Sequence, residues 1–470
     1  MKKIYLLIVL ITSICKTGFS QIFPVDTIQW SGDPSKYINI VIMGDGYTST
    51  MQAKFKSDAK KLSDYMFTQT PFKQYKNYFN VVGIGVVSAD SGAKHPNTAP
   101  DCNSANPTVP VSAPNTYFGC TFDYFNIHRL ITPINTSNIA MVLAQNFPAY
   151  DQTIIISSSP YYGGSGGAYA TSSTETTSPE IVAHEVGHSF ASLSDEYYAG
   201  DVYAGEKINM TKETNPTLVR WKNWIGSPGI GIYQHCCGGS SAQWYKPSSN
   251  SCKMQLLGVP YCSVCQEAIV EKIHQLTNPI VKYTPDSGSV NTPQSMISFR
   301  LIKLMKPIDN TLNITWTLDG VSRDKNKDSI IVNQTLLSAG KHYLTATIID
   351  TSSLVRTDNH PTLHFSKVSW TITRNKTGVN IISSDNKVDC SIFPNPSSDI
   401  MNYSIVFEKP EKFNLQVISI DGKLVHSSEN VEAAKGDFKG NFNISDLPAG
   451  TYSVIFKFGN STHTETFVKE

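Results

Sequence analysis

Two histidines and a glutamate within residues 178–197 carry the most specific chemistry in this sequence. His184 and His188 are four positions apart, so in a helix both imidazoles lie on one face and can bind one metal ion. Glu185 follows the first histidine and projects beside that metal, where it can deprotonate a water molecule. The pattern predicts Zn²⁺ bound by His184 and His188, with Glu185 as the catalytic base. The alternative is a helix with two surface histidines and an ordinary glutamate.

A catalytic zinc ion needs a third protein ligand and one open position for water. Ser194 stands six residues after His188, where a third histidine is found in some zinc peptidases, and serine is a poor ligand. A straight helix would carry Asp195 about 10 Å beyond His188. The helix must therefore end near Ser192. We predict Asp195 as the third ligand and keep Glu196 as the alternative third ligand; either could instead be a charged helix end facing solvent or an arginine.

The helix that positions these side chains has a recognisable start and a clear apolar face. Ser178 is expected as the N-cap, Pro179 at the first helical position and Glu180 in the first turn. The apolar stripe, which should face the core, consists of Val182, Val186, Phe190 and Leu193.

The preceding residues predict an α/β layer. Buried strands are expected at 37–44, 80–87 and 153–157, with a helix over 51–66. This order favours a mixed sheet covered by helices. A loop-rich stretch at 90–117 separates the second and third strands.

The composition changes near residue 278, after which short β-rich runs replace the helical pattern. These runs are separated by turn residues, as in β-sandwiches. The expected domains are a signal peptide at 1–20, a catalytic domain at 21–278, an Ig-like β-sandwich domain at 279–375, a linker at 376–389 and a final domain at 390–470.

Composition and charge limit the function classes. The chain has 470 residues, 40% of them hydrophobic, and a formal net charge of +1, which gives no electrostatic case for nucleic acid as a partner. Lys2 and Lys3 before an apolar run predict an N-terminal signal peptide. That run is too short to span a bilayer, and we expect no membrane span elsewhere. Cys15 raises the alternative of a lipoprotein, with bulky Ile14 against it.

Nine cysteines less Cys15 leave eight in the expected mature chain. In an exported protein this even number favours disulfides over a structural zinc site at Cys262 and Cys265. We predict one specific pair, Cys102 with Cys120.

The segment around His184 resembles the IgA-peptidase family of secreted bacterial zinc metallopeptidases, and so do several others. They are Asn39–Thr48, Pro71–Tyr75, Ser91–Pro96, Tyr162–Gly166, His184–Tyr197, Trp244–Ser248, Cys252–Met254 and Cys262–Cys265. The resemblance covers about residues 35–275. It implies a zinc peptidase with His184 and His188 as ligands and Glu185 as base. It also suggests Met254 as a methionine beneath the metal, although Met254 could equally fill core space.

The last block resembles the C-terminal sorting domain of type IX secretion. The matching segments are Phe393–Pro396, Asp421–Lys423 and Leu447–Tyr452. This resemblance implies the type IX secretion machinery as a partner. It also implies export through the periplasm and outer membrane, so we expect a secreted or cell-surface protein.

We therefore expect a multidomain protein with an α/β zincin-like (metzincin-type) catalytic domain followed by two β-sandwich domains. The expected activity is that of a secreted zinc-dependent endopeptidase, which hydrolyses proteins or glycoproteins through a zinc-activated water and a glutamate general base. Tyr197 or Tyr198 is a candidate donor to the oxyanion, and an edge strand near 168–171 is a candidate for pairing with substrate. The alternatives are an adhesin with a vestigial zinc site and a zinc hydrolase of non-peptide amides.

Overall fold

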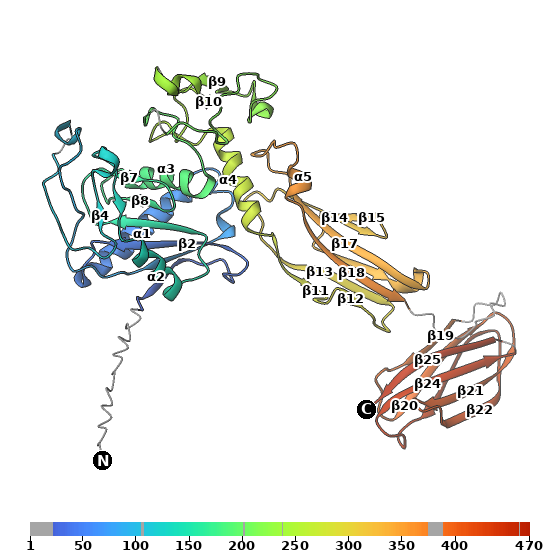
Figure 1. The fold of residues 1–470 in the computed structure, drawn as a ribbon. Helices are drawn as coiled ribbons and strands as arrows, with labels where there is room; N and C mark the ends of the chain where they lie inside the picture. Colours follow the sequence, from blue (N-terminus) through green and yellow to red (C-terminus); the bar gives the residue numbers. More distant parts are fainter. Residues whose placement is uncertain (1–21, 105–107, 201–202, 237, 375–388, 460) are drawn as a thin grey trace, which may run out of the picture. The chain divides into compact units, whose positions relative to one another are not determined.

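The computed structural model describes residues 22–470 apart from 105–107, 201–202, 237, 375–388 and 460 (Figure 1). The expected signal peptide, with Cys15, and Cys237 lie outside the described residues. So does the expected linker, except for Asp389, which begins a strand. The chain divides into two compact units, residues 1–374 and 375–470.

A six-stranded mixed sheet forms the centre of the first part of unit 1. Its four inner strands are parallel, and an antiparallel strand lies at each edge, which agrees with the mixed sheet predicted from the sequence. The order is β1 (Val25–Gln29), β3 (Phe79–Ile84), β2 (Ile38–Asp45), β6 (Gln152–Ser157), β8 (Ala170–Ser172) and β7 (Gly164–Ser165).

Side chains alternate between the two faces of this sheet, so each face has its own apolar core. Ile40 and Ile42 of β2 pack with α1 (Gln52–Met66), α3 (Ser178–Ala191) and α4 (Ser263–Leu276). Val41 and Met43 pack on the other face with α2 (Thr136–Asn146) and with the loops between β3 and α2. The helix with the candidate site therefore lies against a rigid sheet.

Helix α3 begins one residue away from its expected cap. Thr177 is the N-cap and makes no capping side-chain bond; its hydroxyl bonds Glu175 instead, while Ser178 is already helical. The apolar stripe is buried as predicted, with Val182, Val186, Phe190 and Leu193 at most 3% exposed. Helix α3 ends at Ala191, because Ser192 adopts the left-handed conformation at φ 55°. This is the end near Ser192 that a zinc ligand at Asp195 was predicted to require.

The predicted edge strand near 168–171 is wrong in its position. Residues 170–172 form β8, which lies between β6 and β7 and is buried. The edge is the short strand β7, and the N–H of Gly164 in β7 already donates to the carbonyl of Arg129. The glycine-rich turn thus contributes the last strand, which the sequence pattern did not indicate.

Irregular segments with short elements complete this region. The small strands are β4 (Cys120–Thr121), β5 (Thr132–Pro133), β9 (Ile230–Gln234) and β10 (Tyr245–Ser248). The 3₁₀ segments of unit 1 are Ser49–Met51, Lys76–Tyr78, Cys102–Ser104, Tyr124–Asn126, Lys222–Trp224, Gly239–Gln243 and Gln334–Leu336.

Residues 280–374 form two sheets around one apolar core. Trp316 and Trp370 stack in this core with ring centroids 5.7 Å apart, and Phe299 of the other sheet lies 5.1 Å from Trp370. Two sheets with a shared core are the arrangement expected of a β-sandwich. The first sheet contains β11 (Ile280–Thr284), β13 (Met296–Leu304) and β16 (Ser329–Asn333); the second contains β12 (Ser289–Val290), β18 (Ser366–Arg374), β17 (Gly340–Asp350), β14 (Leu312–Leu318) and β15 (Val321–Lys325).

Asp350, at the end of β17, joins these sheets to the helices of the preceding region. Its carboxylate accepts a hydrogen bond from the Tyr75 hydroxyl at 2.6 Å and lies 3.1 Å from His274 of α4. Thr311 donates to its other oxygen at 2.6 Å. The short helix α5 (His360–Leu363) follows, with His360 bonded to Glu271 of α4.

Unit 2 also consists of two sheets with one core, which contains Tyr403, Phe413 and Phe456. The sheets are β19 (Asp389–Phe393), β20 (Ile400–Phe407) and β23 (Gly436–Asn443), and β22 (Leu424–Ala433), β21 (Glu411–Ser419), β24 (Gly450–Phe458) and β25 (Ser461–Lys469). Within the described parts of the chain, none of the helices combines the length and apolar character that crossing a bilayer requires.

Candidate metal and catalytic site

The structure brings His184, His188 and Asp195 together at one point. The two Nε2 atoms are 3.1 Å apart, and Oδ1 of Asp195 lies 3.0 Å from that of His184 and 3.2 Å from that of His188. Three ligands of a tetrahedral zinc ion, at about 2.0–2.2 Å from it, are separated from one another by about 3.3–3.5 Å. The three atoms thus approximate one face of such a tetrahedron.

The remaining ring nitrogens orient both histidines. Nδ1 of His184 lies 2.8 Å from the carbonyl of Lys253, and Nδ1 of His188 lies 2.7 Å from the carbonyl of Leu193. A carbonyl can only accept, so each Nδ1 carries a hydrogen, and an imidazole whose only ring hydrogen is on Nδ1 turns the lone pair of Nε2 toward the centre. Two such lone pairs and a carboxylate form a donor set that fits zinc.

The left-handed Ser192 brings Asp195 back toward the helix. Its N–H bonds the carbonyl of His188, and the N–H of Leu193 bonds the carbonyl of Gly187. Glu196, the alternative ligand, lies elsewhere: its carboxylate accepts hydrogen bonds from Asn209 at 3.1 Å and Ser248 at 2.9 Å. The geometry therefore favours Asp195 over Glu196, and the ligand role of Asp195 stays a prediction.

Glu185 lies beside this trio, between two pockets. One pocket of about 530 Å³ is lined by Glu185 and His188, and a second of about 280 Å³ is lined by Glu185 and His184. Glycines on the opposite wall make room for the carboxylate. A Cβ at Gly164 would lie 2.9 Å from Oε1 of Glu185, and one at Gly166 would lie 2.9 Å from Oε2. Side chains larger than hydrogen at these two positions would displace Glu185.

Burial and charge act against each other at this site. Burial raises the pKa of Glu185, and the imidazoles of His184 and His188 reduce that rise. Burial disfavours a charge on His188, but Asp195 outweighs it and raises the pKa of His188 to about 9. Burial likewise opposes the charge of Asp195, yet the two imidazoles hold the pKa of Asp195 well below 3.8. Asp195 is thus a carboxylate that is already ionised.

Tyr197, rather than Tyr198, faces the site. Tyr197 lines both pockets and its ring lies 6.0 Å from that of His184, whereas Tyr198 is 53% exposed. Burial and then the charge of Asp195 raise the pKa of Tyr197, so its phenol keeps a proton to donate. Arg129, which no sequence pattern indicated, donates to the Tyr197 hydroxyl at 3.5 Å and lines both pockets. Nothing in its local sequence distinguishes Arg129 from a loop arginine.

Met254 lies directly below the histidine helix. It is fully buried, and a Cβ at Gly187 would lie 2.6 Å from its sulfur. The carbonyl of Met254 accepts from the N–H of Glu196, and the preceding carbonyl of Lys253 orients His184. Met254 therefore fills core space beside the helix, and its role beneath a metal stays a prediction.

The predicted disulfide between Cys102 and Cys120 is wrong, because both thiols are free. The sulfur of Cys102 lies 3.4 Å from a carboxylate oxygen of Asp123, and Cys120 lies in β4 with its N–H bonded to Asp45. Elsewhere, Cys252 and Cys265 have sulfur atoms 3.6 Å apart, and Cys262 and Glu196 complete this cluster. No disulfide joins these three described cysteines.

Comparisons with known proteins identify two regions. Residues 27–231 match the family model of IgA Peptidase M64, and residues 391–470 match the secretion system C-terminal sorting domain. Both matches agree with the resemblances found in the sequence. No curated protein matches the chain.

Solved structures resemble the chain only weakly. A β-D-glucuronidase from Dictyoglomus thermophilum is 12% identical over 33% of this chain and 32% of its own, with a TM-score of 0.16. A β-glucuronidase from Faecalibacterium prausnitzii is 12% identical over 34% and 33%, with a TM-score of 0.15. The chain thus covers about a third of these two relatives. Catalytically inactive OgpA from Akkermansia muciniphila, solved with an O-glycopeptide substrate, is 8% identical over 92% of both chains, with a TM-score of 0.20.

A C-terminal sorting domain of this kind indicates export to the cell surface or the exterior. The chain thus joins a region that matches the IgA Peptidase M64 family model, residues 27–231, to a region that matches the secretion system C-terminal sorting domain, residues 391–470.

Proposed function

We propose that this protein is a secreted zinc endopeptidase that cleaves extracellular proteins or glycoproteins. The observation that carries the proposal is the position of Glu185 beside the converging atoms of His184, His188 and Asp195, with a pocket on either side. The family match independently supports peptidase chemistry.

In this proposal His184, His188 and Asp195 hold Zn²⁺, which when bound polarises the scissile carbonyl and makes a water molecule more acidic. Glu185 accepts the proton of that water and passes it to the nitrogen of the leaving amine. Tyr197, held by Arg129, donates a hydrogen bond to the carbonyl oxygen as negative charge develops on it. Met254 supports the helix from below and keeps the two imidazoles in place.

The two pockets favour an endopeptidase over an exopeptidase. Arg129, Glu185 and Tyr197 line both of them, so a peptide centred on Glu185 has binding space on both sides of the bond to be cleaved. An exopeptidase would close one side to fix a chain terminus. We assign this activity to a zincin-like catalytic domain at 21–278, followed by an Ig-like domain at 279–375, a linker at 376–389 and the sorting domain at 390–470.

A cleavage assay with matched variants tests this function. The full chain, Glu185→Gln and Asp64→Asn are incubated with immunoglobulins, mucins and a mixed panel of other proteins, and the zinc content of each preparation is measured. Both substitutions replace a carboxylate by an amide, but Asp64 is an exposed residue of α1. We expect cleavage by the wild type and Asp64→Asn, and loss of cleavage in Glu185→Gln with zinc retained. Cleavage by Glu185→Gln at the wild-type rate would refute the proposed base. A folded, zinc-loaded wild type that cleaves nothing in the panel would refute the peptidase assignment.

A further inference from the structure

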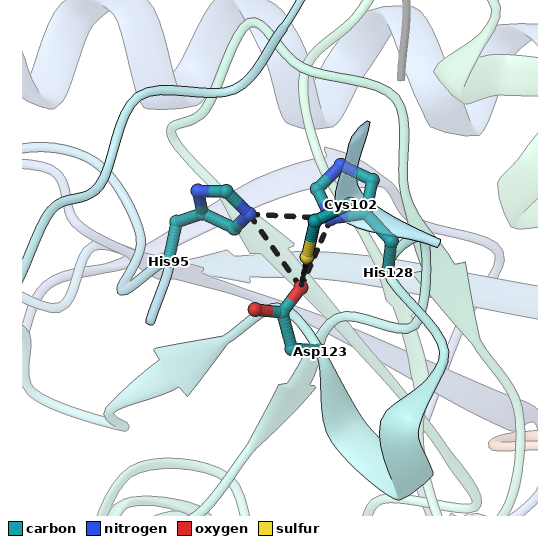
Figure 2. Close-up of side chains that lie close together, drawn as sticks. All are labelled: His95, Cys102, Asp123 and His128. Atoms are coloured by element: carbon teal, nitrogen blue, oxygen red, sulfur yellow. Dashed lines mark hydrogen bonds and ion pairs between the residues drawn. The ribbon is translucent and has the colours of Figure 1, made fainter. Parts of the chain in front are cut away.

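A second group of metal-ligand side chains lies in the irregular segment between β3 and α2 (Figure 2). It consists of His95, Cys102, Asp123 and His128, all buried, and four of their ligand atoms lie within 4.8 Å of one another. None of these residues belongs to the trio near Glu185. From their geometry we propose that this cluster is a second, structural zinc site, independent of the catalytic one.

Four of the six separations between these atoms are close to those of a tetrahedral shell, and all six are within 4.8 Å. Oδ1 of Asp123 lies 2.9 Å from Nδ1 of His128, 3.5 Å from Nε2 of His95 and 3.4 Å from Sγ of Cys102. The two ring nitrogens are 3.2 Å apart. Zinc bonds of ordinary length require about 3.4 Å between nitrogen or oxygen ligands and about 3.6 Å when one ligand is sulfur. These four separations differ from the required values by about half an ångström at most.

The hydrogen-bond pattern calls for a cation at the centre. Nδ1 of His95 lies 3.1 Å from the carbonyl of Pro110, which can only accept, so Nδ1 carries the hydrogen. When His95 carries that hydrogen alone, its Nε2 is an acceptor that faces His128 and the Asp123 carboxylate. The single hydrogen on Nδ1 of His128 cannot satisfy both acceptors. A bound cation satisfies all of them and also favours the thiolate of Cys102.

The ligands come from separate segments that are positioned by the backbone. The second oxygen of Asp123 accepts from the N–H of Thr98 at 2.8 Å, and the N–H of His128 donates to Asp101 at 2.9 Å. His95 exchanges two backbone hydrogen bonds with Ser112. Such outer contacts orient ligands before a metal binds.

The metal would also stabilise a strained turn. Asp123, Phe125 and Asn126 have φ values of 62°, 52° and 62°, in the left-handed region, which is costly above all for a bulky residue such as Phe125. Asp123 and His128 stand at the two ends of this turn, and Tyr124 and Phe125 between them line the pocket beside Glu185. Four protein ligands leave no open position, which is the arrangement of a structural zinc site. The second zinc thus fixes one wall of the catalytic cleft.

Metal content and cobalt spectroscopy test this site without any use of peptidase activity. For the full chain we expect about two zinc ions per molecule, falling to about one in Cys102→Ser and to about one in His188→Ala. Cys120→Ser, which changes a buried thiol of β4 outside the cluster, should keep both. After exchange with Co²⁺, the wild type should show a charge-transfer band from the Cys102 thiolate to cobalt. The trio near Glu185 cannot produce this band, because it contains no sulfur. The band should disappear in Cys102→Ser and persist in Cys262→Ser, which alters the other cysteine cluster.

Several results would overturn the proposal. One is a folded wild type with a single zinc ion and no thiolate band, a result that requires no variant to fold. Another is a band that survives Cys102→Ser but is lost in Cys262→Ser, which would place the metal among Cys252, Cys262 and Cys265. If Cys102→Ser does not fold, Cys102→His keeps four donors: the proposal then requires two metal ions and no thiolate band.

Discussion

Asp195 and Glu196 are consecutive residues whose carboxylates belong to two separate sites. Oδ1 of Asp195 lies 3.0 Å from Nε2 of His184, whereas Glu196 is fully buried and accepts hydrogen bonds from Asn209 and Ser248. Burial raises the pKa of Glu196 well above its ordinary value, which favours a neutral side chain, while Asp195 stays ionised. One peptide step therefore separates a candidate zinc ligand from a structural hydrogen-bonding group.

Substitutions at these two positions should separate the two roles. Asp195→Asn should weaken zinc binding by more than the roughly 10–100-fold that the loss of an outer-shell partner costs, and activity should fall with it. Glu196→Gln should keep zinc and activity, because an amide replaces a neutral acid of the same shape. Glu196→Ala should destabilise the fold by roughly 1–3 kcal/mol for each buried partner left unsatisfied. Zinc titration and denaturant unfolding measure the two effects. Zinc loss in Glu196→Gln but not in Asp195→Asn would reverse the ligand assignment.

Gly166 lies too close to His188 and Glu185 to accept a side chain. A Cβ there would lie 2.6 Å from Cβ of His188 and 2.9 Å from Oε2 of Glu185, so Gly166→Ala must displace one of them. A displacement of about 1 Å in a catalytic group costs about 100-fold in rate. We expect a drop of that order in kcat, with unfolding behaviour close to that of the wild type. Gly205→Ala is the matched control, because its Cβ would meet no atom within 4 Å. Equal kcat values for Gly166→Ala and Gly205→Ala would show that Glu185 and His188 accommodate the added methyl group without loss of their catalytic positions.

Much of this site could be predicted from periodicity. The i, i+4 histidines and the apolar stripe required a helix with two distinct faces, and α3 has both. The length of a helical turn also required a break before Asp195, and Ser192 provides it in the left-handed conformation. The N-cap was placed one residue late because Ser178 and Thr177 are both good capping residues.

Periodicity gave no indication of the functional residues in the loops. Arg129 and the ligands of the proposed second zinc site lie in segments without a repeating pattern, and only tertiary pairing brings them together. The cysteine count favoured a disulfide, but Cys102 points to Asp123 rather than to Cys120. A histidine, a cysteine, an aspartate and another histidine within residues 95–128 were the available signal, and their irregular spacing hid it. The edge strand was misplaced because the glycine-rich turn carries β7.

The third prediction separates the two neighbouring tyrosines. Tyr197→Phe should lower kcat by roughly 100–1000-fold with little change in KM, as expected when one oxyanion donor is removed. Tyr198→Phe should behave as the wild type, since Tyr198 is 53% exposed. Arg129→Lys should fall between them, because lysine keeps the charge but loses the planar guanidinium that lies over the Tyr197 ring. Steady-state kinetics on a cleaved peptide give kcat and KM separately. A change confined to KM in Tyr197→Phe would assign this residue to substrate binding instead.

The last prediction concerns acid stability and the carboxylate of Asp350. Burial opposes its charge, but hydrogen bonds from His274, Thr311 and Tyr75 outweigh that effect and lower the pKa of Asp350 from 3.8 to about 2. A lowered folded-state pKa stabilises the protein above the unfolded-state pKa. This stabilisation is lost as the pH falls from about 4 to 2 and amounts to roughly 2 kcal/mol.

Asp350→Asn removes that titration and should lessen the loss of stability between pH 4 and pH 2 by the same amount. Asp328→Asn serves as the control, because its exposed pair with Lys306 should contribute little. Denaturant unfolding of the three proteins at several pH values, followed by tryptophan fluorescence, measures the difference. Identical pH profiles for Asp350→Asn and the wild type would mean that the carboxylate is not what joins β17 to α4. Tyr75, which donates to Asp350, belongs to the apolar core that contains residues of α1, α3 and α4. The expected profile therefore links the stability of residues 280–374 to that of the region that carries Glu185.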